Sequence, residues 1–336
     1  MQNYTKIVVK NPWQQAENVQ YEYFLVNKNA EIPAELTNKT IIRTPVERIV
    51  CMSTSHIAAL EALGETNKIV GVSGKDYIFN KKIQQQIENG ETLDVGYEQN
   101  MNFEQLLSIN ADLIMIYGVN GETQSFIERL KELNIPVVIN GDYLEASPLG
   151  KTEWLLFMAA FFNKIEIAQK NVLDIENEYI ALKQMVASKI TDRPSVFFNT
   201  PYKEVWYMPG GKSYMANLII DAGADYLWGK DSSSESFSIN FEVVINEAAK
   251  ADFWLHQGSS NSVSDVLKID ERLENFQSLK NNCLYNNNLR TTPNGGNDFW
   301  ETGVMQPHVV LKDLVSIFHQ NIFPEYQPVY YKKLSD

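Results

Sequence analysis

The residues of this chain that could do chemistry are few and scattered. The two cysteines, Cys51 and Cys283, are far apart and indicate no disulfide framework. No Ser-His-Asp, Cys-His or paired-carboxylate arrangement is present. None of the four histidines stands at a spacing typical of metal ligands, and no HxH, HExxH or CxxC motif occurs; they are His56, His256, His308 and His319. The sequence therefore predicts no catalytic set, no metal site and no resident cofactor.

Two glutamates share one unusual local setting. Glu104 lies in MNFEQLL and Glu242 in INFEVVI, each in the first turn of a predicted helix, and each helix leads into a strand through an Ala-Asp pair. An acid in a first turn can simply complement the helix dipole. The repeated setting also indicates equivalent positions in two similar lobes.

Two glycine-containing strings have two interpretations each. Residues 209–213, PGGKS, lack the spacing of a phosphate-binding loop and indicate a tight turn before a helix, whose N-terminus could still meet an anionic group. Residues 294–301, GGNDFWE with the preceding Asn, could form a lid or stacking platform, or pack against a sheet edge.

The elements around these residues alternate between strands and helices. In the first half we predict strands at 48–53, 68–73, 94–96, 112–118 and 135–140, with helices at 56–63, 81–88, 103–109 and 122–133. In the second half we predict strands at 195–200, 204–208 (a possible hairpin partner of the first), 252–257 and 283–288, with helices at 213–222, 241–249, 270–276 and 307–321. Continuous apolar strands linked by helices are typical of parallel sheets covered on both faces. The predicted fold class is α/β, with two Rossmann-like lobes, each built on a mostly parallel sheet, joined by one long helix.

The middle of the chain predicts this joining helix. After a short helix at 153–162 and a break at Asn163, one apolar stripe runs along a long helix: Ala168, Val172, Ile175, Tyr179, Leu182 and Val186. We therefore divide the chain into an extension at 1–40 that packs on the first lobe, a first lobe at 41–150, a connector at 151–188 and a second lobe at 189–336. A single helical connector resists bending, so we expect small lobe motions on ligand binding.

Composition excludes other classes of protein. A length of 336 residues is typical of two domains. The formal net charge of −13 argues against a nucleic-acid binder. No run of about 20 apolar residues could span a membrane, and no signal peptide is visible.

The loops at the carboxyl ends of parallel strands gather at one edge, and two facing lobes would form a ligand cleft between such edges. The loops include residues 53–56, 73–77, 96–97, 117–119, 199–202, 257–259 and 288–300. The candidate ligand-binding residues, from these loops and from residues 206–212, are Ser55, His56, Lys75, Tyr77, Tyr97, Tyr117, Tyr202, Trp206, Tyr207, Lys212, Gln257, Arg290 and Trp300.

From about Arg43 onward, the chain resembles the substrate-binding proteins of ABC importers for iron–siderophore complexes, haem and cobalamin. In the first lobe the resemblance rests on PVERIV, LEALG, IVGV, VG, NFEQLL and ADLI, beginning at residues 45, 60, 69, 95, 102 and 111. In the second it rests on PGG, AGA and FEVV, beginning at 209, 222 and 241, and in the middle on the run from Pro148 to Leu182. The string GGNDFWE, with PHVVLKDLVSIFH after it, is similar to a branch of iron-complex binders.

This resemblance implies a monomeric binding protein of the periplasm or the outer membrane face, anchored as a lipoprotein whose signal is absent from this chain. It also implies that Glu104 and Glu242 dock against arginines of an ABC permease dimer. No enzymatic activity is expected.

The choice of ligand depends on charge and aromatic area. Haem or cobalamin would need the broad aromatic surface that Tyr77, Tyr97, Trp206, Tyr207 and Trp300 offer. An anionic ferric siderophore would need Lys75, Lys212 and Arg290. Because the predicted loops hold few basic residues, a weakly charged ferric chelate is favoured, with haem or cobalamin as the alternative. A two-lobed cofactor-binding enzyme is a remote alternative, since it would need cluster-ligating cysteines or a catalytic set.

Overall fold

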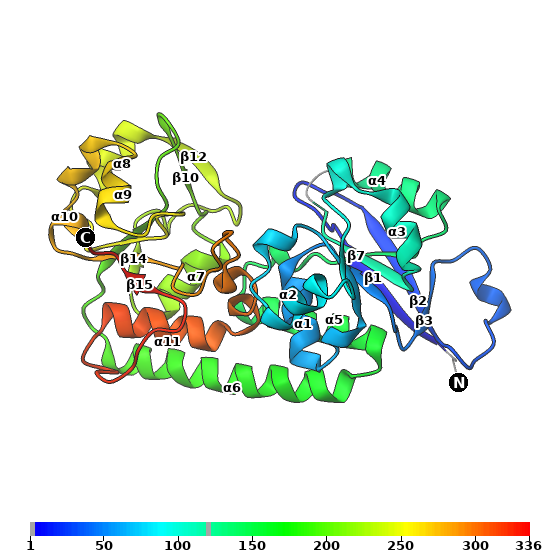
Figure 1. The fold of residues 1–336 in the computed structure, drawn as a ribbon. Coiled ribbons are helices and arrows are strands. Elements are labelled where there is room, and N and C mark those ends of the chain that lie inside the picture. The colour runs from blue at the N-terminus through cyan, green and yellow to red at the C-terminus, as the bar shows by residue number, and fades with distance from the viewer. Residues whose placement is uncertain (1–3, 119–121) are drawn as a thin grey trace. The chain divides into compact units, whose positions relative to one another are not determined.

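The computed structural model describes residues 4–118 and 122–336, so residues 1–3 of the predicted extension and Val119 of a predicted ligand loop lie outside it (Figure 1). The chain splits into two compact units. Unit 1 comprises Met1–Leu144, Glu153–Leu173 and Trp300–Met305, and unit 2 comprises Glu145–Thr152, Asp174–Phe299 and Gln306–Asp336. The sequence-based division placed all of 189–336 in the second lobe and so did not foresee the return of Trp300–Met305 to unit 1.

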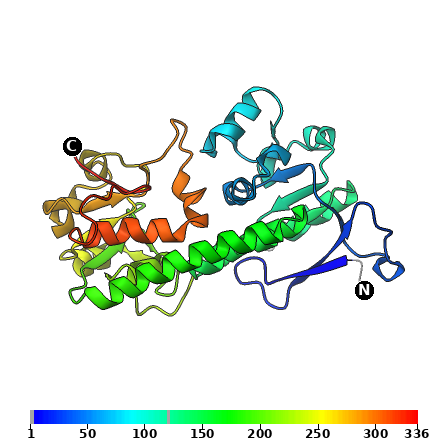
Figure 2. The ribbon, with the colours of Figure 1, turned by 90° about the horizontal axis from the view of Figure 1, so that it is seen from below.

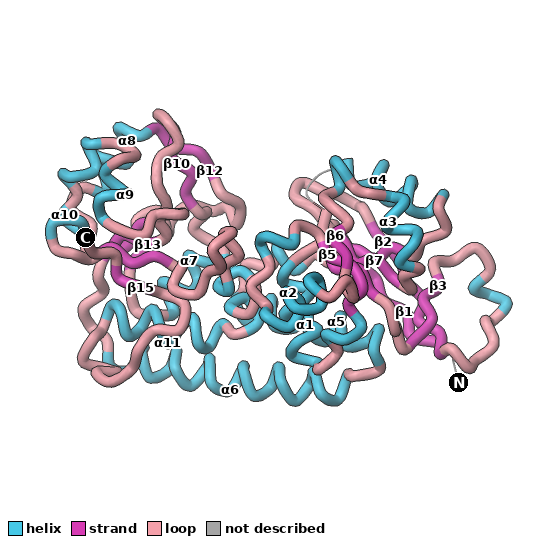
Figure 3. Tube along the Cα trace, in the orientation of Figure 1, coloured by secondary structure: helices cyan, strands magenta, loops and turns pink. Residues whose placement is uncertain are grey.

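Unit 1 is built on a five-stranded parallel sheet, drawn in magenta in Figure 3. The strands lie in the order β6-β5-β4-β7-β8, with bounds β4 Ile49–Cys51, β5 Ile69–Val72, β6 Leu93–Asp94, β7 Leu113–Ile116 and β8 Val137–Ile139. Four of these strands were predicted from their apolar runs, whereas β6 was predicted at 94–96, one residue too far along; the predicted α/β fold class is confirmed.

The side chains of these strands alternate between two apolar cores. Cys51 and Met115 point into one core and Val50 and Ile114 into the other, as the two-residue period of a strand requires. Helices cover both faces. The first core includes residues of α1 Thr54–Leu63, α2 Lys81–Glu88 and α5 Pro148–Phe162, and the second includes residues of α3 Phe103–Ile109 and α4 Glu122–Glu132.

The N-terminal segment forms a separate sheet on unit 1. Strands β1 Tyr4–Lys10 and β2 Gln20–Asn27 form an antiparallel hairpin, and β3 Ile41–Thr44 pairs parallel to β2. The Tyr23 hydroxyl accepts a hydrogen bond from the Ile139 amide at 3.0 Å, and Tyr23 and Leu25 join the first core of unit 1.

Unit 2 repeats this architecture with an altered strand order. Its sheet has the order β11-β9-β13-β14-β15, parallel except for the last strand. The bounds are β9 Ser195–Phe198, β11 Asp225–Tyr226, β13 Phe253–Leu255, β14 Leu284–Asn286 and β15 Lys332–Lys333. The helices are α7 Tyr214–Asp221, α8 Phe241–Ala248, α9 Val263–Leu267, α10 Gln277–Lys280 and α11 Pro307–Phe318.

One prediction for unit 2 is wrong. Strand β10 Val205–Met208 is not a hairpin partner of β9, because β9 already has β11 and β13 on its two sides; β10 instead pairs antiparallel with β12 Phe237–Asn240. The segment predicted to be helical at 270–276 is a 3₁₀ helix, Glu271–Asn275, which the Asp270 side chain caps. The other 3₁₀ segments are Ala34–Leu36, Thr66–Lys68, Lys75–Tyr77, Glu98–Asn100, Asp142–Leu144, Asp298–Trp300 and Gly303–Met305.

The predicted long helix is α6 Ile165–Lys189, continuous in Figure 2 (green). Its least exposed positions include the six residues of the predicted stripe, among which Ala168, Tyr179 and Val186 are buried. The predicted break is confirmed as well. Asn163 has a φ of 57°, a left-handed conformation that ends α5, and α6 begins two residues later. Asparagine tolerates this conformation better than most residues.

Replacing Asn163 tests this break. Asn163→Gly should unfold at the same urea concentration as the wild type, whereas Asn163→Val should lose about 1–2 kcal/mol, because a β-branched residue is strained at positive φ. Asn177→Ala, at an exposed position within α6, is the matched control and should be neutral or slightly stabilising. Equal midpoints for the Gly and Val variants would contradict the assignment.

Candidate functional site

In unit 1 the strand order reverses at β4, which lies between β5 and β7. Ligands of open α/β sheets bind beside the carboxyl ends of strands at such a switch point. The loop after β4 begins at Met52 and contains Ser53, which caps α1 by accepting from the Ser55 amide, and the loop after β7 begins at Tyr117. The next two loops along this edge, after β5 and β6, hold Lys75, Tyr77 and Tyr97.

The Asp94 carboxylate fixes the geometry of these two loops. It accepts hydrogen bonds from the backbone amides of Gly74, Lys75 and Gly96, each at 3.1 Å. One side chain at the end of β6 thus ties the loop after β5 to the loop after β6. Asp94 was not among the residues predicted from the sequence, although its place between two strand-end glycines could have identified it.

The Tyr97 phenol covers Gly74. Gly74 has a φ of 68°, and a Cβ at this position would overlap the Tyr97 ring. Glycine is therefore required both for the backbone conformation and for the approach of the ring. Tyr97 remains 41% exposed and Tyr77 57% exposed, so both rings present area to a ligand.

The phenols of Tyr97 and Tyr117 stay protonated at neutral pH. Partial burial, together with the nearby Tyr77, Asp94 and Asp76, raises the pKa of Tyr97 above its usual value of about 10. Burial and Glu98 likewise raise the pKa of Tyr117, whose ring meets Tyr143 edge-on at 6.5 Å. These tyrosines can therefore donate and accept hydrogen bonds while stacking on a flat ligand.

The prediction that His56 contacts ligand is wrong. Its side chain is fully buried on the inner side of α1, and desolvation lowers its pKa to about 4, with Asp142 acting in the opposite direction. A neutral imidazole inside unit 1 supports packing. Ser55 is also buried, and its hydroxyl contacts that of Ser53 at 2.9 Å. Lys75 is exposed.

In unit 2 the switch point lies between β9 and β13. Each strand is followed directly by a residue of positive φ, Asn199 at 66° and His256 at 62°. Such conformations are uncommon outside glycine and are held here by surrounding bonds. The Asn199 side chain donates to the Tyr207 carbonyl at 2.7 Å, and the His256 Nε2 lies 2.7 Å from the Tyr331 hydroxyl.

Burial contradicts two more predicted ligand residues, both in unit 2. Trp206 is fully buried among Phe197, Phe241 and Trp254, and its indole N–H donates to the Phe198 carbonyl at 2.8 Å. Gln257 is also buried, and its amide donates to the Trp254 carbonyl at 2.7 Å. Both side chains complete the interior instead of facing a ligand.

The exposed candidates of unit 2 are Tyr202, Tyr207, Lys212 and Arg290. The turn before Lys212 depends on its glycines, because a Cβ on Gly210 would overlap the Ser233 carbonyl and one on Gly211 the Asp231 carbonyl. This explains the PGG string as a tight turn, and Ser213 then caps α7.

The string at 294–301 is mostly packed. Arg290 Nε lies 2.6 Å from an oxygen of the fully buried Asp298, so the Arg290 charge is paired within unit 2. In unit 1, the buried Glu301 carboxylate accepts from the amides of Phe79 and Asn80, both at 2.8 Å. Trp300, the residue before Glu301, is 48% exposed, so its ring is open to solvent.

The two repeated glutamates lie on exposed first turns, Glu104 on α3 and Glu242 on α8. Asn102 caps α3 by accepting from the Gln105 amide, and Asn240 caps α8 by accepting from the Glu242 amide. In unit 2, the Arg272 guanidinium donates to Glu242 at 2.7 Å. The sequence analysis missed Arg272, because only the fold brings residue 272 next to residue 242.

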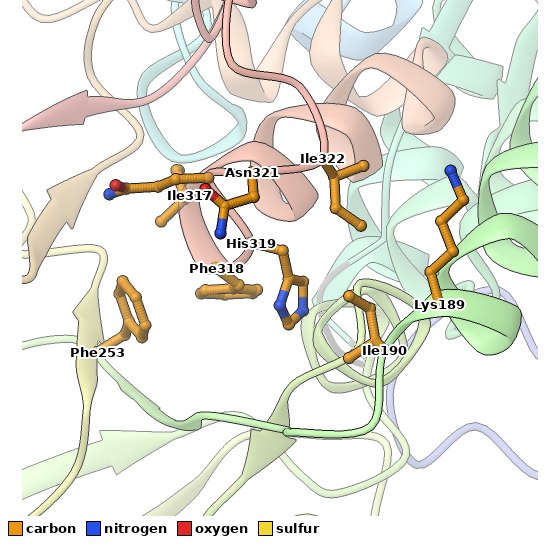
Figure 4. Close-up of a pocket in the computed structure, with 9 residues that line it drawn as sticks. Lys189, Ile190, Phe253, Ile317, Phe318, His319, Asn321 and Ile322 are labelled. Atoms are coloured by element: carbon orange, nitrogen blue, oxygen red, sulfur yellow. The ribbon is translucent and has the colours of Figure 1, made fainter.

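A surface pocket of about 580 Å³ lies elsewhere in unit 2 (Figure 4). Phe253, the first residue of β13, and His319, just after α11, both point into it, so it lies at the amino end of the sheet. No residue predicted to bind ligand lines this pocket.

Within residues 4–118 and 122–336, no group of three or more His, Cys, Asp and Glu side chains is placed to hold a metal ion. No helix in the same ranges has the length and apolar character needed to cross a membrane.

The chain belongs to the periplasmic binding protein family, whose model matches residues 49–287, more than half of the sequence. This confirms the resemblance inferred from the sequence motifs. An uncharacterized lipoprotein of Methanocaldococcus jannaschii is 28% identical over 317 residues, covering 90% of this chain and 73% of the relative.

Solved structures share the fold at low identity. The periplasmic heme-binding protein RhuT of Roseiflexus sp. RS-1 is 22% identical with a TM-score of 0.59, covering 82% of this chain and 98% of that protein. A protein described as an ABC-type Fe3+-hydroxamate transport system of Saccharomonospora viridis is 16% identical with a TM-score of 0.60, covering 82% and 94%.

The Gly74–Tyr97 contact gives a test of the unit 1 edge. Gly74→Ala should lower the unfolding midpoint more than Gly64→Ala, because both glycines have positive φ but a Cβ at Gly64 meets no atom within 4 Å. Strain at positive φ should cost about 1–2 kcal/mol in both variants, and the overlap with the phenol should add to it only at Gly74. When Tyr97→Ala is also present, the cost of Gly74→Ala in unfolding free energy should fall to that of Gly64→Ala. Equal costs of the two glycine substitutions in the wild-type background would refute the contact.

Proposed function

We propose that this protein captures a weakly charged ferric chelate of the siderophore type and delivers it to an ABC permease. Membership of the periplasmic binding protein family supports a solute-binding role. The observation that carries the choice of ligand surface is the exposed tyrosine edge of unit 1, where Tyr77 and Tyr97 lie at the carboxyl end of the sheet.

The charges along this edge favour a chelate of low net charge. The acidic residues near the tyrosines are Asp76, Asp94 and Glu98, and they outnumber the exposed basic residue Lys75. In unit 2, Arg290 already pairs with Asp298, while Lys212 is exposed. A highly anionic ligand would meet nearby carboxylates, and like charges of this kind select against a ligand.

Haem or cobalamin is the second candidate. The exposed aromatic side chains favour a flat macrocycle, since rings of this kind stack on extended π surfaces. They are Tyr77, Tyr97, Tyr202, Tyr207 and Trp300. The solved relative from Roseiflexus is itself described as heme-binding.

In the proposed role, Glu104 and Glu242 dock the two units against arginines of a permease dimer. Their exposure supports an electrostatic contact that steers association and suits transient delivery. We further propose a location in the periplasm or on the outer membrane face as a lipoprotein, which the lipoprotein description of the archaeal relative supports.

Thermal unfolding against ferric hydroxamate and catecholate siderophores, haem and cobalamin tests the ligand. The true ligand at 100 times its Kd should stabilise the protein by about 2.7 kcal/mol. Tyr97→Ala should reduce this shift. Stabilisation by cobalamin or haem alone would identify that compound, and not a siderophore, as the ligand. The binding role would be refuted if none of these compounds raised the unfolding temperature and the protein turned over some substrate.

A charge-deletion experiment tests the preference for low net charge. The double variant Lys75→Gln, Lys212→Gln should keep its affinity for a neutral ferric chelate within about twofold, since exposed ion pairs contribute little. The matched control replaces Lys10 and Lys250, exposed lysines outside the candidate loops. A selective loss of affinity in the first variant would show that the ligand is anionic.

A further inference from the structure

The two glutamate helices share a second feature beyond their sequence. In unit 1 the Arg129 guanidinium lies 3.9 Å from the centre of the Phe103 ring, and in unit 2 the Arg272 guanidinium lies 4.2 Å from the centre of the Phe241 ring. Each phenylalanine immediately precedes the proposed docking glutamate. Both units therefore place an arginine over the same ring beside the same acid, a stacking that guanidinium groups favour.

The two arginines differ in what they do to the acid. Arg272 Nη1 donates to Glu242 Oε1 at 2.7 Å, so the Glu242 carboxylate has a fixed partner. Among the described residues, Glu104 forms no ion pair and Arg129 none with it. The stacking of arginine on phenylalanine is thus common to the two units, whereas the ion pair between this arginine and the glutamate is formed in unit 2.

Arg272 is anchored independently of Glu242. Its Nε and Nη2 donate to the two oxygens of Asp270 at 3.0 and 2.8 Å, a two-point contact that fixes the guanidinium plane. The Phe241 ring supports the face of that plane. When Glu242 engages a partner, Arg272 therefore has no need to move.

The cluster around Arg272 remains attractive to a cation. Glu204, Glu242 and Asp270 surround one guanidinium, which leaves an excess of two negative charges. Glu242 is 61% exposed, and its contact with Arg272 uses Oε1. An incoming arginine can therefore bind at Oε2 while Arg272 holds the other oxygen.

We propose that Arg272 is a positioning residue for docking: it holds the Glu242 carboxylate in one orientation for an arginine of the permease, whereas Glu104 contributes charge without a fixed orientation. This inference rests on the proposed docking function. Because the carboxylate is preoriented, unit 2 loses less side-chain freedom on docking, and its contact should dissociate more slowly.

The test measures association and dissociation rates on the cognate ABC permease complex in lipid nanodiscs by surface plasmon resonance. Arg272→Gln should raise the dissociation rate about three- to fivefold, the range expected for an exposed pair. The association rate should stay equal or rise, because the surface becomes more negative. Arg272→Lys keeps the charge without the planar fork and should give an intermediate dissociation rate.

Arg129→Gln is the matched control, since it removes the same charge and the same stacking next to Glu104. It should change the dissociation rate by less than about twofold. Thermal unfolding followed by circular dichroism shows which variants are folded. If Arg272→Gln is not folded, the dissociation rate of Arg272→Lys is compared with that of Arg129→Gln instead.

The outcomes separate this inference from the function it rests on. Slower dissociation of Arg272→Gln would mean that Arg272 competes with the permease, and equal effects of Arg272→Gln and Arg129→Gln would mean that it acts through charge alone; either result overturns the positioning role and leaves docking intact. Rates unaffected by Glu104→Gln and Glu242→Gln, or no binding of the wild type, would overturn docking itself and the inference with it.

Discussion

The burial of both faces of each central sheet constrains everything else in this protein. In β4, Val50 and Cys51 enter opposite cores, and in β9 the same alternation divides Phe197 from Phe198. With apolar side chains required on both sides, polar groups can stand only where the strands end. The carboxyl-end loops are thus the places where these sheets can carry recognition, and single side chains such as Asp94 fix their shape.

The same constraint explains how much the sequence could predict. Continuous apolar runs identified most strands of the two central sheets but not β11 or β15, and the stripe on α6 and the asparagine that precedes it located the long helix, because burial and backbone conformation act on neighbouring residues. The failures at His56, Trp206 and Gln257 have another origin. Position next to a strand end locates the backbone, but the direction of the side chain depends on packing partners distant in sequence. The pairing of strand β10 was missed for a related reason, since its partner β12 is distant in sequence and has no apolar run to identify it.

The two glutamate helices combine local and non-local determinants. The Asn-Phe-Glu string sets the cap, the buried or half-buried ring and the exposed acid, and each of these follows from adjacent residues. Whether the acid is held depends on an arginine that lies 30 residues further along the chain in unit 2. Two similar strings can therefore produce surfaces of different rigidity.

The return of Trp300–Met305 to unit 1 ties the folding of the first half of the chain to its last part. Val304 and Met305 belong to the core that α1 and β4 form, and Glu301 supplies the acceptors for two amides at the start of α2. N-terminal domains generally fold first during synthesis. Here the first core can be completed only after residues 301–305 have left the ribosome, so unit 1 cannot finish folding on its own N-terminal residues.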